Sequence, residues 1–268
     1  MGMMEKCRKY CSEALGTAVL VGLGCGTAVF ARGAGAGFGV VTSAWVMTVA
    51  LAFGLAMMAM VYALGSISGA HLNPAVSLSM ALRKKMGWLE CVFYIISQII
   101  GAVLGALALF ILIKLMGIPA TGNMGVNSYS TGVLAGLATW RQIIIAMLVE
   151  IALTFVFVFT FLGVTRKGQN KVVSGIVIGL TLMLVHLMGV AITGASINPA
   201  RSLAPAFFGG TVALREVWVF IVAPLIGGAL AALAAWCKFR NEDDETEVAD
   251  AEPARPRTTT ARSTTARG

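Results

Sequence analysis

Long stretches without a charged side chain alternate with short clusters of Lys and Arg along this chain of 268 residues. No Lys, Arg, Asp or Glu occurs between Gly33 and Leu82, or between Val172 and Ala200. A helix needs roughly 20 apolar residues to cross the hydrocarbon core of a bilayer. The pattern therefore predicts an all-α integral membrane protein that contacts the lipid bilayer through six transmembrane helices, near residues 12–31, 43–65, 90–114, 142–164, 172–192 and 216–237.

Two of the uncharged stretches are longer than the spans they contain, and each surplus includes an Asn-Pro-Ala triplet. The triplets are Asn73-Pro74-Ala75 and Asn198-Pro199-Ala200. Asn is a strong helix N-cap, and Pro suits the first helical position. We therefore predict short helices over 74–82 and 199–208, each about 13 Å long and so about half the membrane thickness. Such re-entrant half-helices are tolerated only where their open backbone is buried in protein or lines a wet cavity.

The two surplus regions are copies of each other. Residues 66–77 align without a gap with residues 191–202, and seven of the twelve positions are identical. Each copy contains three spans and one half-helix. Because three is odd, the second copy must be inverted in the membrane, so the half-helices enter from opposite sides and their N-termini approach each other near the midplane. The predicted segments are an N-terminus (1–11), a first inverted repeat (12–116), a connecting loop (117–141), a second inverted repeat (142–238) and a tail (239–268).

The Lys and Arg residues are distributed unequally between the two sets of loops. Eleven fall in loops on the side of the two termini and four on the other side. By the positive-inside rule both termini are cytoplasmic, the connecting loop is extracellular, and the chain is a multi-pass protein of the plasma (inner) membrane. The last segment begins acidic and ends in Thr, Ser, Pro and Arg, which predicts a disordered cytoplasmic tail.

Composition supports the membrane assignment and argues against several other functions. Charged residues make up 12% of the chain, with a mean hydropathy of +0.86, whereas soluble domains carry about 25% charged residues. The net charge of +8 comes from short clusters between spans, so we expect no nucleic-acid partner. The sequence contains no Ser/His/Asp set and no metal-ligand spacing, and its five cysteines form no disulfide pattern. We therefore expect no enzyme, no cofactor and no metal.

Two half-helix N-termini that meet inside a membrane favour the passage of neutral molecules. The aligned peptide dipoles create a positive potential there, which repels cations including hydronium. Asn73 and Asn198 add side-chain N–H donors that can hold a permeating oxygen. Glu13 and Glu150 lie inside the first and fourth spans; a proton relay is one interpretation, but their symmetric placement favours hydrogen bonds that support the re-entrant backbone.

These motifs resemble the aquaporin family of major intrinsic proteins over roughly residues 10–238. The resemblance rests on the duplicated Asn-Pro-Ala, the Ser-Ile-Ser-Gly-Ala-His-Leu-Asn-Pro-Ala-Val box and the Asn-Pro-Ala-Arg-Ser box. It implies the family's aquaporin-like fold of six spans and two half-helices, a homotetramer with one pore in each subunit, and water as the permeant.

The resemblance also implies a selectivity filter at four positions, which in this sequence are Phe53, His186, Ala195 and Arg201. Phe53 and His186 together indicate a narrow polar opening, and glycerol-type relatives commonly have Gly at the His position. Arg201 would donate to water and repel cations. Ala195 and Ile221 depart from the water-type pattern, which indicates a slightly wider opening.

We therefore expect a passive channel that conducts water in single file and excludes protons and ions; the alternative is a facilitator for glycerol or another small uncharged solute. A secondary transporter shares the inverted repeats and broken helices, but proton-linked transport would distinguish it. A purely structural junction protein would show negligible water flux.

Overall fold

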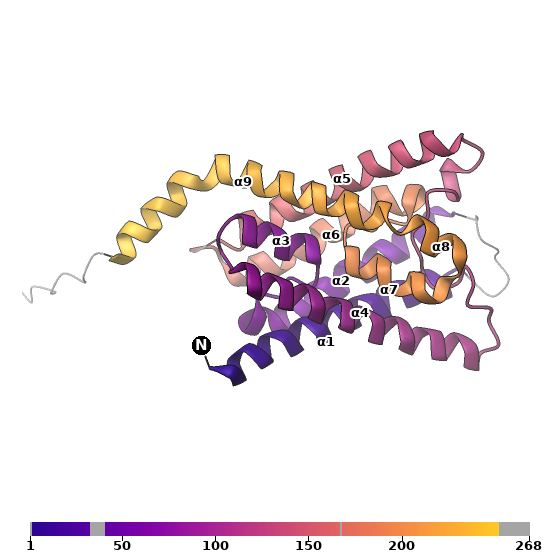
Figure 1. The fold of residues 1–268 in the computed structure, drawn as a ribbon, viewed down its shortest axis with the longest axis horizontal. Coiled ribbons are helices and arrows are strands. Elements are labelled where there is room, and N and C mark those ends of the chain that lie inside the picture. Colours follow the sequence, from indigo (N-terminus) through magenta and orange to yellow (C-terminus); the bar gives the residue numbers. More distant parts are fainter. Residues whose placement is uncertain (1, 33–40, 167, 252–268) are drawn as a thin grey trace, which may run out of the picture.

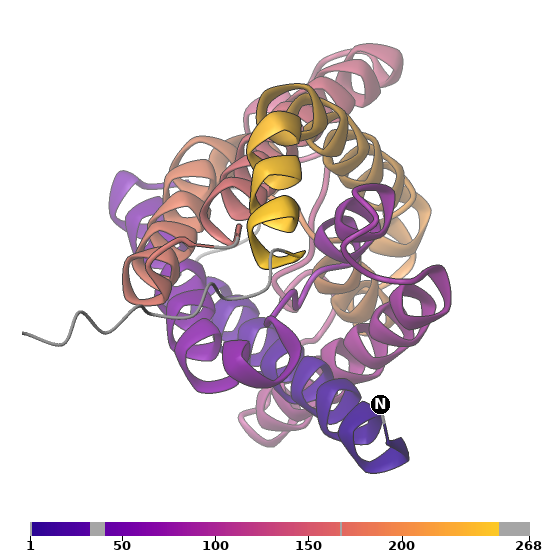
Figure 2. The same cartoon turned by 90° about the vertical axis from the view of Figure 1, so that its left-hand side faces the viewer.

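The computed structural model describes residues 2–32, 41–166 and 168–251, and every regular element in these ranges is helical. Six long helices form a bundle around a common axis (Figures 1 and 2). They are α1 (Met3–Phe30), α2 (Ser43–Ser68), α4 (Trp88–Leu115), α5 (Thr139–Val164), α6 (Lys171–Thr193) and α9 (Val219–Ala251). Six segments of the described chain are long and apolar enough to cross a membrane, so the prediction of six spans is confirmed.

The helix ends differ from the predicted spans for local reasons. α1 begins at Met3 rather than near residue 12, because the basic N-terminal segment continues the helix beyond its apolar part. The last span begins as the short helix α8 (Thr211–Glu216) and continues as α9 after a turn at residues 217–218. A 3-10 turn, η1 (Gly132–Leu134), lies in the connecting loop.

Two short helices lie inside the bundle. α3 (Pro74–Leu82) has the predicted bounds, and α7 (Pro199–Gly209) ends one residue later than predicted. Asn73 and Asn198 are their N-caps, and each accepts a hydrogen bond from the backbone two residues on. Figure 1 shows α3 toward the end of the bundle where α1 begins, and α7 toward the opposite end, as expected for an inverted repeat.

The two halves of the chain interlock. In each half the first long helix packs against the third, α1 on α4 and α5 on α9, while α2 packs on α6 across the halves. Each half-helix also packs against the third long helix of the other half, α3 on α9 and α7 on α4. The centre of the molecule is therefore built equally from both repeats.

Packing inside the bundle is close, while the outer surface is apolar. At Gly101 of α4 an added Cβ would lie 1.9 Å from the Ala14 carbonyl oxygen of α1, so only Gly allows this approach. Large apolar residues such as Leu23, Leu148 and Leu184 are exposed on the outside, at 59%, 63% and 61%. Exposure of this kind on all long helices suits contact with lipid rather than water.

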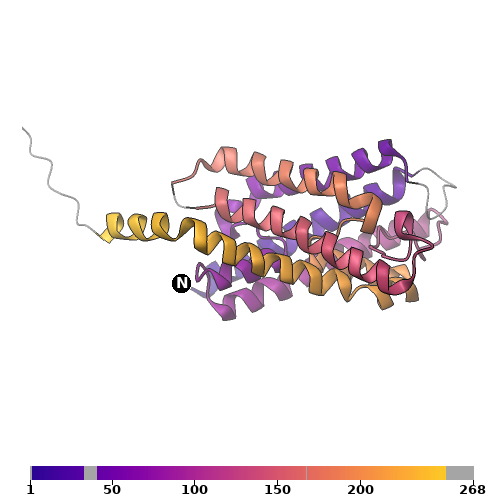
Figure 3. The ribbon, with the colours of Figure 1, turned by 90° about the horizontal axis from the view of Figure 1, so that it is seen from above.

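The expectation of a disordered tail from residue 239 is wrong for its first part. Helix α9 continues to Ala251 and extends beyond the rest of the bundle (Figure 3). No Gly or Pro occurs between residues 239 and 251, and extending an existing helix costs far less than starting one. Residues 252–268 lie outside the described residues. The beginning of α1 and the end of α9 lie at one end of the bundle, called here the terminal side (Figure 1).

Candidate pore

The loops that lead into α3 and α7 have the same unusual backbone. Ala70 and Leu72 in the first repeat, and Ala195 and Ile197 in the second, have positive φ angles of 47°, 51°, 51° and 59°. This left-handed conformation costs roughly 1–2 kcal/mol for each non-glycine residue. In this conformation the backbone N–H groups of each loop are bound by a glutamate, while the carbonyl oxygens of Leu72 and Ile197 accept from the asparagines of the triplets.

In each repeat one buried glutamate binds the N–H groups of this loop. Glu13 Oε1 accepts hydrogen bonds from Ser68 Oγ (2.7 Å) and from the backbone N–H of His71 (2.9 Å). Its Oε2 accepts from the backbone N–H of Leu72 (2.7 Å) and from Gln98 Nε2 (2.8 Å). The carboxylate thus stabilises the strained loop by accepting four hydrogen bonds.

Glu150 makes the equivalent contacts in the second repeat. It accepts from Thr193 Oγ1 (2.6 Å) and from the backbone N–H groups of Ser196 and Ile197, both at 2.9 Å. Both glutamates are fully buried, and each lies on the first long helix of its repeat. These contacts are the ones a half-helix support requires, and the carboxylates lie behind the loops rather than among the residues that line the central cavity.

The two Asn-Pro-Ala triplets meet at the centre of the bundle. Asn73 Nδ2 donates to the carbonyl oxygen of Ile197 (3.0 Å), and Asn198 Nδ2 donates to the carbonyl oxygen of Leu72 (2.7 Å). Each amide therefore fixes the loop of the other repeat while its Oδ1 caps its own half-helix. Because a carboxamide has two N–H donors, each Asn has a second N–H in addition to the one used in this crossed pair.

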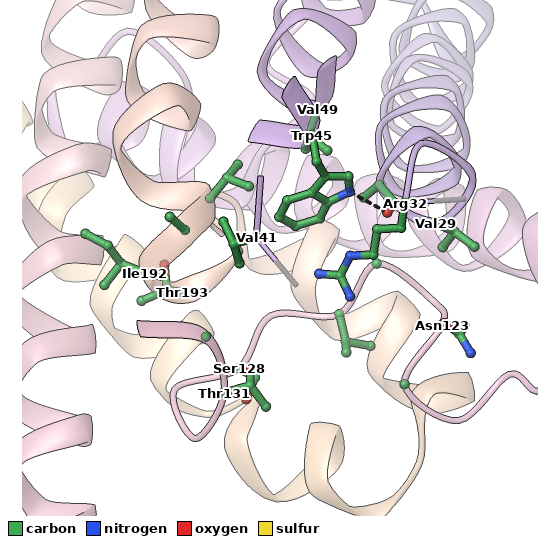
Figure 4. Close-up of a pocket in the computed structure, with 18 of the residues that line it drawn as sticks. Val29, Arg32, Val41, Trp45, Val49, Asn123, Ser128, Thr131, Ile192 and Thr193 are labelled. Atoms are coloured by element: carbon green, nitrogen blue, oxygen red, sulfur yellow. Dashed lines mark hydrogen bonds between the residues drawn. The ribbon is translucent and has the colours of Figure 1, made fainter. Parts of the chain in front are cut away.

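Three cavities follow one another along the bundle axis. The terminal-side cavity, about 500 Å³, is lined by residues from α2, α6 and the loop between α5 and α6, and by His71. The central cavity, about 10 Å³, is lined by both asparagines of the triplets. The far-side cavity, about 50 Å³, is lined by the ends of α1 and α6, the start of α2 and the loop at residues 122–132 (Figure 4). Arg201 lines both the central and the far-side cavities.

Three of the four predicted filter residues surround the central cavity. The rings of Phe53 and His186 are stacked, with centroids 4.4 Å apart. The guanidinium carbon of Arg201 lies 4.8 Å from the centroid of Phe53. All three residues are at most 2% exposed. Together they form a narrow constriction, whose polar atoms are shielded from bulk water.

The constriction presents one acceptor and one donor toward its cavity. His186 Nδ1 is hydrogen-bonded to the Leu182 carbonyl oxygen at 2.8 Å, so it carries the proton and leaves Nε2 as an acceptor. Arg201 Nη1 donates to the Gly125 carbonyl oxygen at 2.9 Å. Within the described residues, His186 Nε2 and Arg201 Nε are buried and have no hydrogen-bond partner.

The Ala195 side chain lies outside the constriction. It is fully buried and lines neither the central nor the far-side cavity. Its methyl group packs against α6, where a Cβ added at Gly189 would come within 3.0 Å of it. The methyl group of Ala195, on a left-handed backbone, is therefore packed against α6 and is absent from the walls of both cavities.

The connecting loop contributes residues that sequence reasoning missed. Gly125 supplies the carbonyl that holds Arg201, and Asn127 Oδ1 accepts from Ser202 Oγ at 2.7 Å. Glu216 is a third fully buried carboxylate; it accepts from Ser128 Oγ (2.7 Å) and the Tyr129 backbone N–H (2.9 Å). An acidic residue directly before an apolar helix was the available signal for Glu216, whereas no sequence pattern marked Gly125.

Fold and site together define a multi-pass membrane protein in which a row of cavities passes between two inverted half-helices. The sequence matches the family described as Major intrinsic protein over residues 1–235. The chain belongs to this family, whose members are membrane channels.

The chain is equally similar in sequence to a relative named as a glycerol facilitator and to one named as an aquaporin. The chain is 38% identical to "Glycerol uptake facilitator protein-like 6" of Lactiplantibacillus plantarum, over 85% of this chain and 96% of that protein. It is also 38% identical to "Aquaporin Z" of Bradyrhizobium diazoefficiens, over 83% of this chain and 90% of that protein. The X-ray structure of the aquaglyceroporin from Plasmodium falciparum superimposes with a TM-score of 0.75 at 22% identity, covering 90% of this chain and 99% of that one; this likeness supports the fold alone.

Proposed function

We propose that this protein is a passive channel that conducts water in single file down an osmotic gradient and excludes protons and ions. The central cavity, about 10 Å³, carries this proposal, because a water molecule requires roughly 10–15 Å³ of such space. Beside it, His186 Nε2 accepts and Arg201 Nε donates a hydrogen bond. A water molecule satisfies both groups at once, since it has two donors and two acceptor lone pairs.

Charge selectivity has two sources along the proposed path. Arg201 places a full positive charge at the constriction, where low dielectric strengthens its repulsion of cations. The N-termini of α3 and α7 add the positive ends of two helix dipoles at the crossed asparagines. Asn73 and Asn198 both present N–H donors there, so a passing water turns its oxygen toward them. That orientation interrupts a continuous proton-conducting chain of waters.

The proposed membrane setting follows from the charge distribution. The excess of Lys and Arg in the loops on the terminal side supports cytoplasmic termini in a plasma or inner membrane. The far-side cavity is then the outer vestibule, and the terminal-side cavity is the inner vestibule. A homotetramer with one pore in each subunit is proposed from the family resemblance.

A glycerol facilitator is the second candidate, favoured by the name of the Lactiplantibacillus plantarum relative. Glycerol is wider than water and carries an apolar carbon backbone, so it needs a larger opening. The stacked pair of Phe53 and His186 closes the space such a solute would need. For this reason we favour water.

Replacing His186 by Gly tests the proposal. Removing the imidazole opens the constriction beside Phe53, and we expect glycerol permeability of proteoliposomes to rise about tenfold or more, equivalent to lowering the barrier by roughly 1.4 kcal/mol. Leu184→Gly is the matched control, because Leu184 lies on the same helix and is 61% exposed on its outer side, and because the substitution introduces the same helix-weakening Gly. Equal glycerol permeability in His186→Gly and wild type would show that this constriction does not select the solute.

A further inference from the structure

The loop at residues 122–132 holds Arg201 at the constriction. Residues 122–131 belong to no helix or strand, and Ser128 and Thr131 of this loop border the outer vestibule (Figure 4). Within the described residues the guanidinium of Arg201 makes one hydrogen bond, from Nη1 to the Gly125 carbonyl oxygen at 2.9 Å. The position of this carbonyl therefore decides where the guanidinium lies, and whatever fixes the loop also fixes Arg201.

Glu216 fixes the part of the loop that follows Gly125. It is the last residue of α8 and is fully buried. Its Oε2 accepts hydrogen bonds from Ser128 Oγ (2.7 Å), the Tyr129 N–H (2.9 Å) and the Ser130 N–H (3.4 Å). Buried backbone N–H groups require an acceptor, which in an irregular loop has to come from another segment. One carboxylate oxygen thus serves three consecutive residues of the loop.

The same contact pattern occurs at both re-entrant loops. There, one oxygen of Glu13 or Glu150 accepts from a side-chain hydroxyl and from a nearby backbone N–H. Glu216 differs because its second oxygen, Oε1, is buried and has no hydrogen-bond partner within the described residues. Nη2 of Arg215 lies 3.8 Å from it, which is too far for a hydrogen bond. All contacts with the loop therefore depend on a single acceptor oxygen, which the amide of Gln also possesses.

The segment between Gly125 and Ser128 is short and closely packed. A Cβ added at Gly125 would lie 2.8 Å from the Cβ of Cys25, so α1 blocks movement of this residue on that side. The side-chain amide of Asn127 is hydrogen-bonded to α7 and to the end of α6. Ser128 is the third residue after Gly125, so a displacement at Ser128 reaches the carbonyl that holds Arg201 through very little chain.

We propose that Glu216 is a positioning residue for Arg201. It acts through the loop, because the backbone that it binds carries the Gly125 carbonyl a few residues earlier. Loss of the carboxylate leaves three donors of the loop without their acceptor, the loop shifts, and the guanidinium loses its fixed place beside Phe53. The hold on the loop stands on these hydrogen bonds alone, whereas the effect on solute selection rests on the proposed function.

Hydrogen exchange of the solubilised protein tests the hold on the loop without any transport. In Glu216→Ala the Tyr129 amide loses its acceptor, and we expect its exchange to become about tenfold faster or more. Glu216→Gln should exchange like wild type, because its amide oxygen can take the place of Oε2. Arg215→Ala is the control, since Arg215 is the neighbouring residue and its side chain is 71% exposed. Unchanged exchange in Glu216→Ala would overturn the proposal.

The ratio of glycerol permeability to water permeability tests the link to Arg201. A variant that only folds less well lowers both permeabilities together and leaves their ratio unchanged, whereas a displaced guanidinium widens the constriction. We expect Glu216→Ala to raise the ratio about fivefold or more, in the same direction as Arg201→Ala, while Glu216→Gln and Arg215→Ala keep the wild-type ratio. Adding Glu216→Ala to Arg201→Ala should change the ratio no further, since both substitutions act on one guanidinium.

Ser128→Ala keeps the proposal testable if Glu216→Ala does not fold. It removes one of the three donors to Oε2, so it should raise the ratio in the same direction by a smaller factor. A wild-type ratio in folded Glu216→Ala, or in Ser128→Ala where only that variant folds, would overturn the positioning role. A further rise in the double variant would also overturn it. A wild-type protein that conducts no water would refute the proposed function, and the exchange experiment would still decide whether Glu216 holds the loop.

Discussion

Replacement of Glu13 or Glu150 by Gln should release the re-entrant loop that the glutamate holds. The substitution keeps the size of the side chain but changes one acceptor oxygen into an N–H₂ donor. In Glu150→Gln, the oxygen that remains can still accept from Thr193 and Ser196, as Oε1 does now. The new amide then faces the backbone N–H of Ile197, which Oε2 binds at 2.9 Å. Two donors facing each other leave that N–H unsatisfied.

The magnitude follows from the number of donors that lose an acceptor. A buried donor without a partner costs about 1–3 kcal/mol, so Glu150→Gln should destabilise the fold by roughly that amount. Glu13→Gln places its amide opposite Leu72 N–H and Gln98 Nε2. The Gln98 side-chain oxygen has no partner among the described residues, so the Gln98 side chain can turn until this oxygen accepts a hydrogen bond from the new amide at position 13. The cost is then again one backbone N–H, about 1–3 kcal/mol.

The crossed asparagines transmit each change to the other repeat. Leu72 and Ile197 also provide the carbonyl oxygens that hold Asn198 and Asn73. Both variants should therefore lower the water permeability per subunit as well as the melting temperature in detergent. Glu90→Gln is the matched control, since Glu90 forms a partly exposed ion pair with Lys9 at 3.2 Å, worth about 0–1 kcal/mol. Melting temperatures and permeabilities of Glu13→Gln and Glu150→Gln equal to those of Glu90→Gln would refute the proposed support.

Two further predictions concern glycines in α1 and α4. A Cβ at Gly24 would lie 2.3 Å from the Phe53 ring, so Gly24→Ala should push the ring into the constriction and reduce the water permeability of a folded protein. Gly26→Ala is the control, because its nearest atom would be 3.6 Å away, and it should conduct water normally. Equal water permeabilities of the two variants would contradict this prediction. At Gly101 a Cβ would meet the backbone of α1 at 1.9 Å, so Gly101→Ala should lower stability by about 1–3 kcal/mol or more. Gly22→Ala, with 3.7 Å to its nearest atom, should melt like wild type, and a matching melting temperature for Gly101→Ala would show that the helices can separate without cost.

The spans and half-helices were predictable because their causes are local in the sequence. Uncharged runs of sufficient length specify membrane helices, and Asn73-Pro74 and Asn198-Pro199 specify a cap followed by a helix start. The duplication of these triplets in segments with an odd number of spans then required an inverted arrangement. The structure places Phe53, His186 and Arg201 around one cavity, which Ala195 does not line; their role as a filter stays a prediction from the family resemblance.

The features that were not predictable depend on contacts between distant segments. Nothing in the sequence around Leu72 or Ile197 indicates a left-handed backbone, since branched and bulky residues disfavour it. The left-handed backbone is tolerated because a carboxylate from another helix binds the N–H groups that this backbone exposes. The same reason applies to Gly125, whose importance comes from Arg201, 76 residues later in the chain.

Stopped-flow light scattering on wild-type proteoliposomes, with one sucrose gradient and one glycerol gradient on the same vesicles, tests whether the protein is a water-selective channel. For such a channel we expect fast shrinkage with low activation energy in both gradients and no rapid re-swelling in glycerol. Rapid re-swelling in glycerol would contradict water selectivity at the constriction of Phe53, His186 and Arg201, and shrinkage no faster than that of empty liposomes would contradict a water channel altogether.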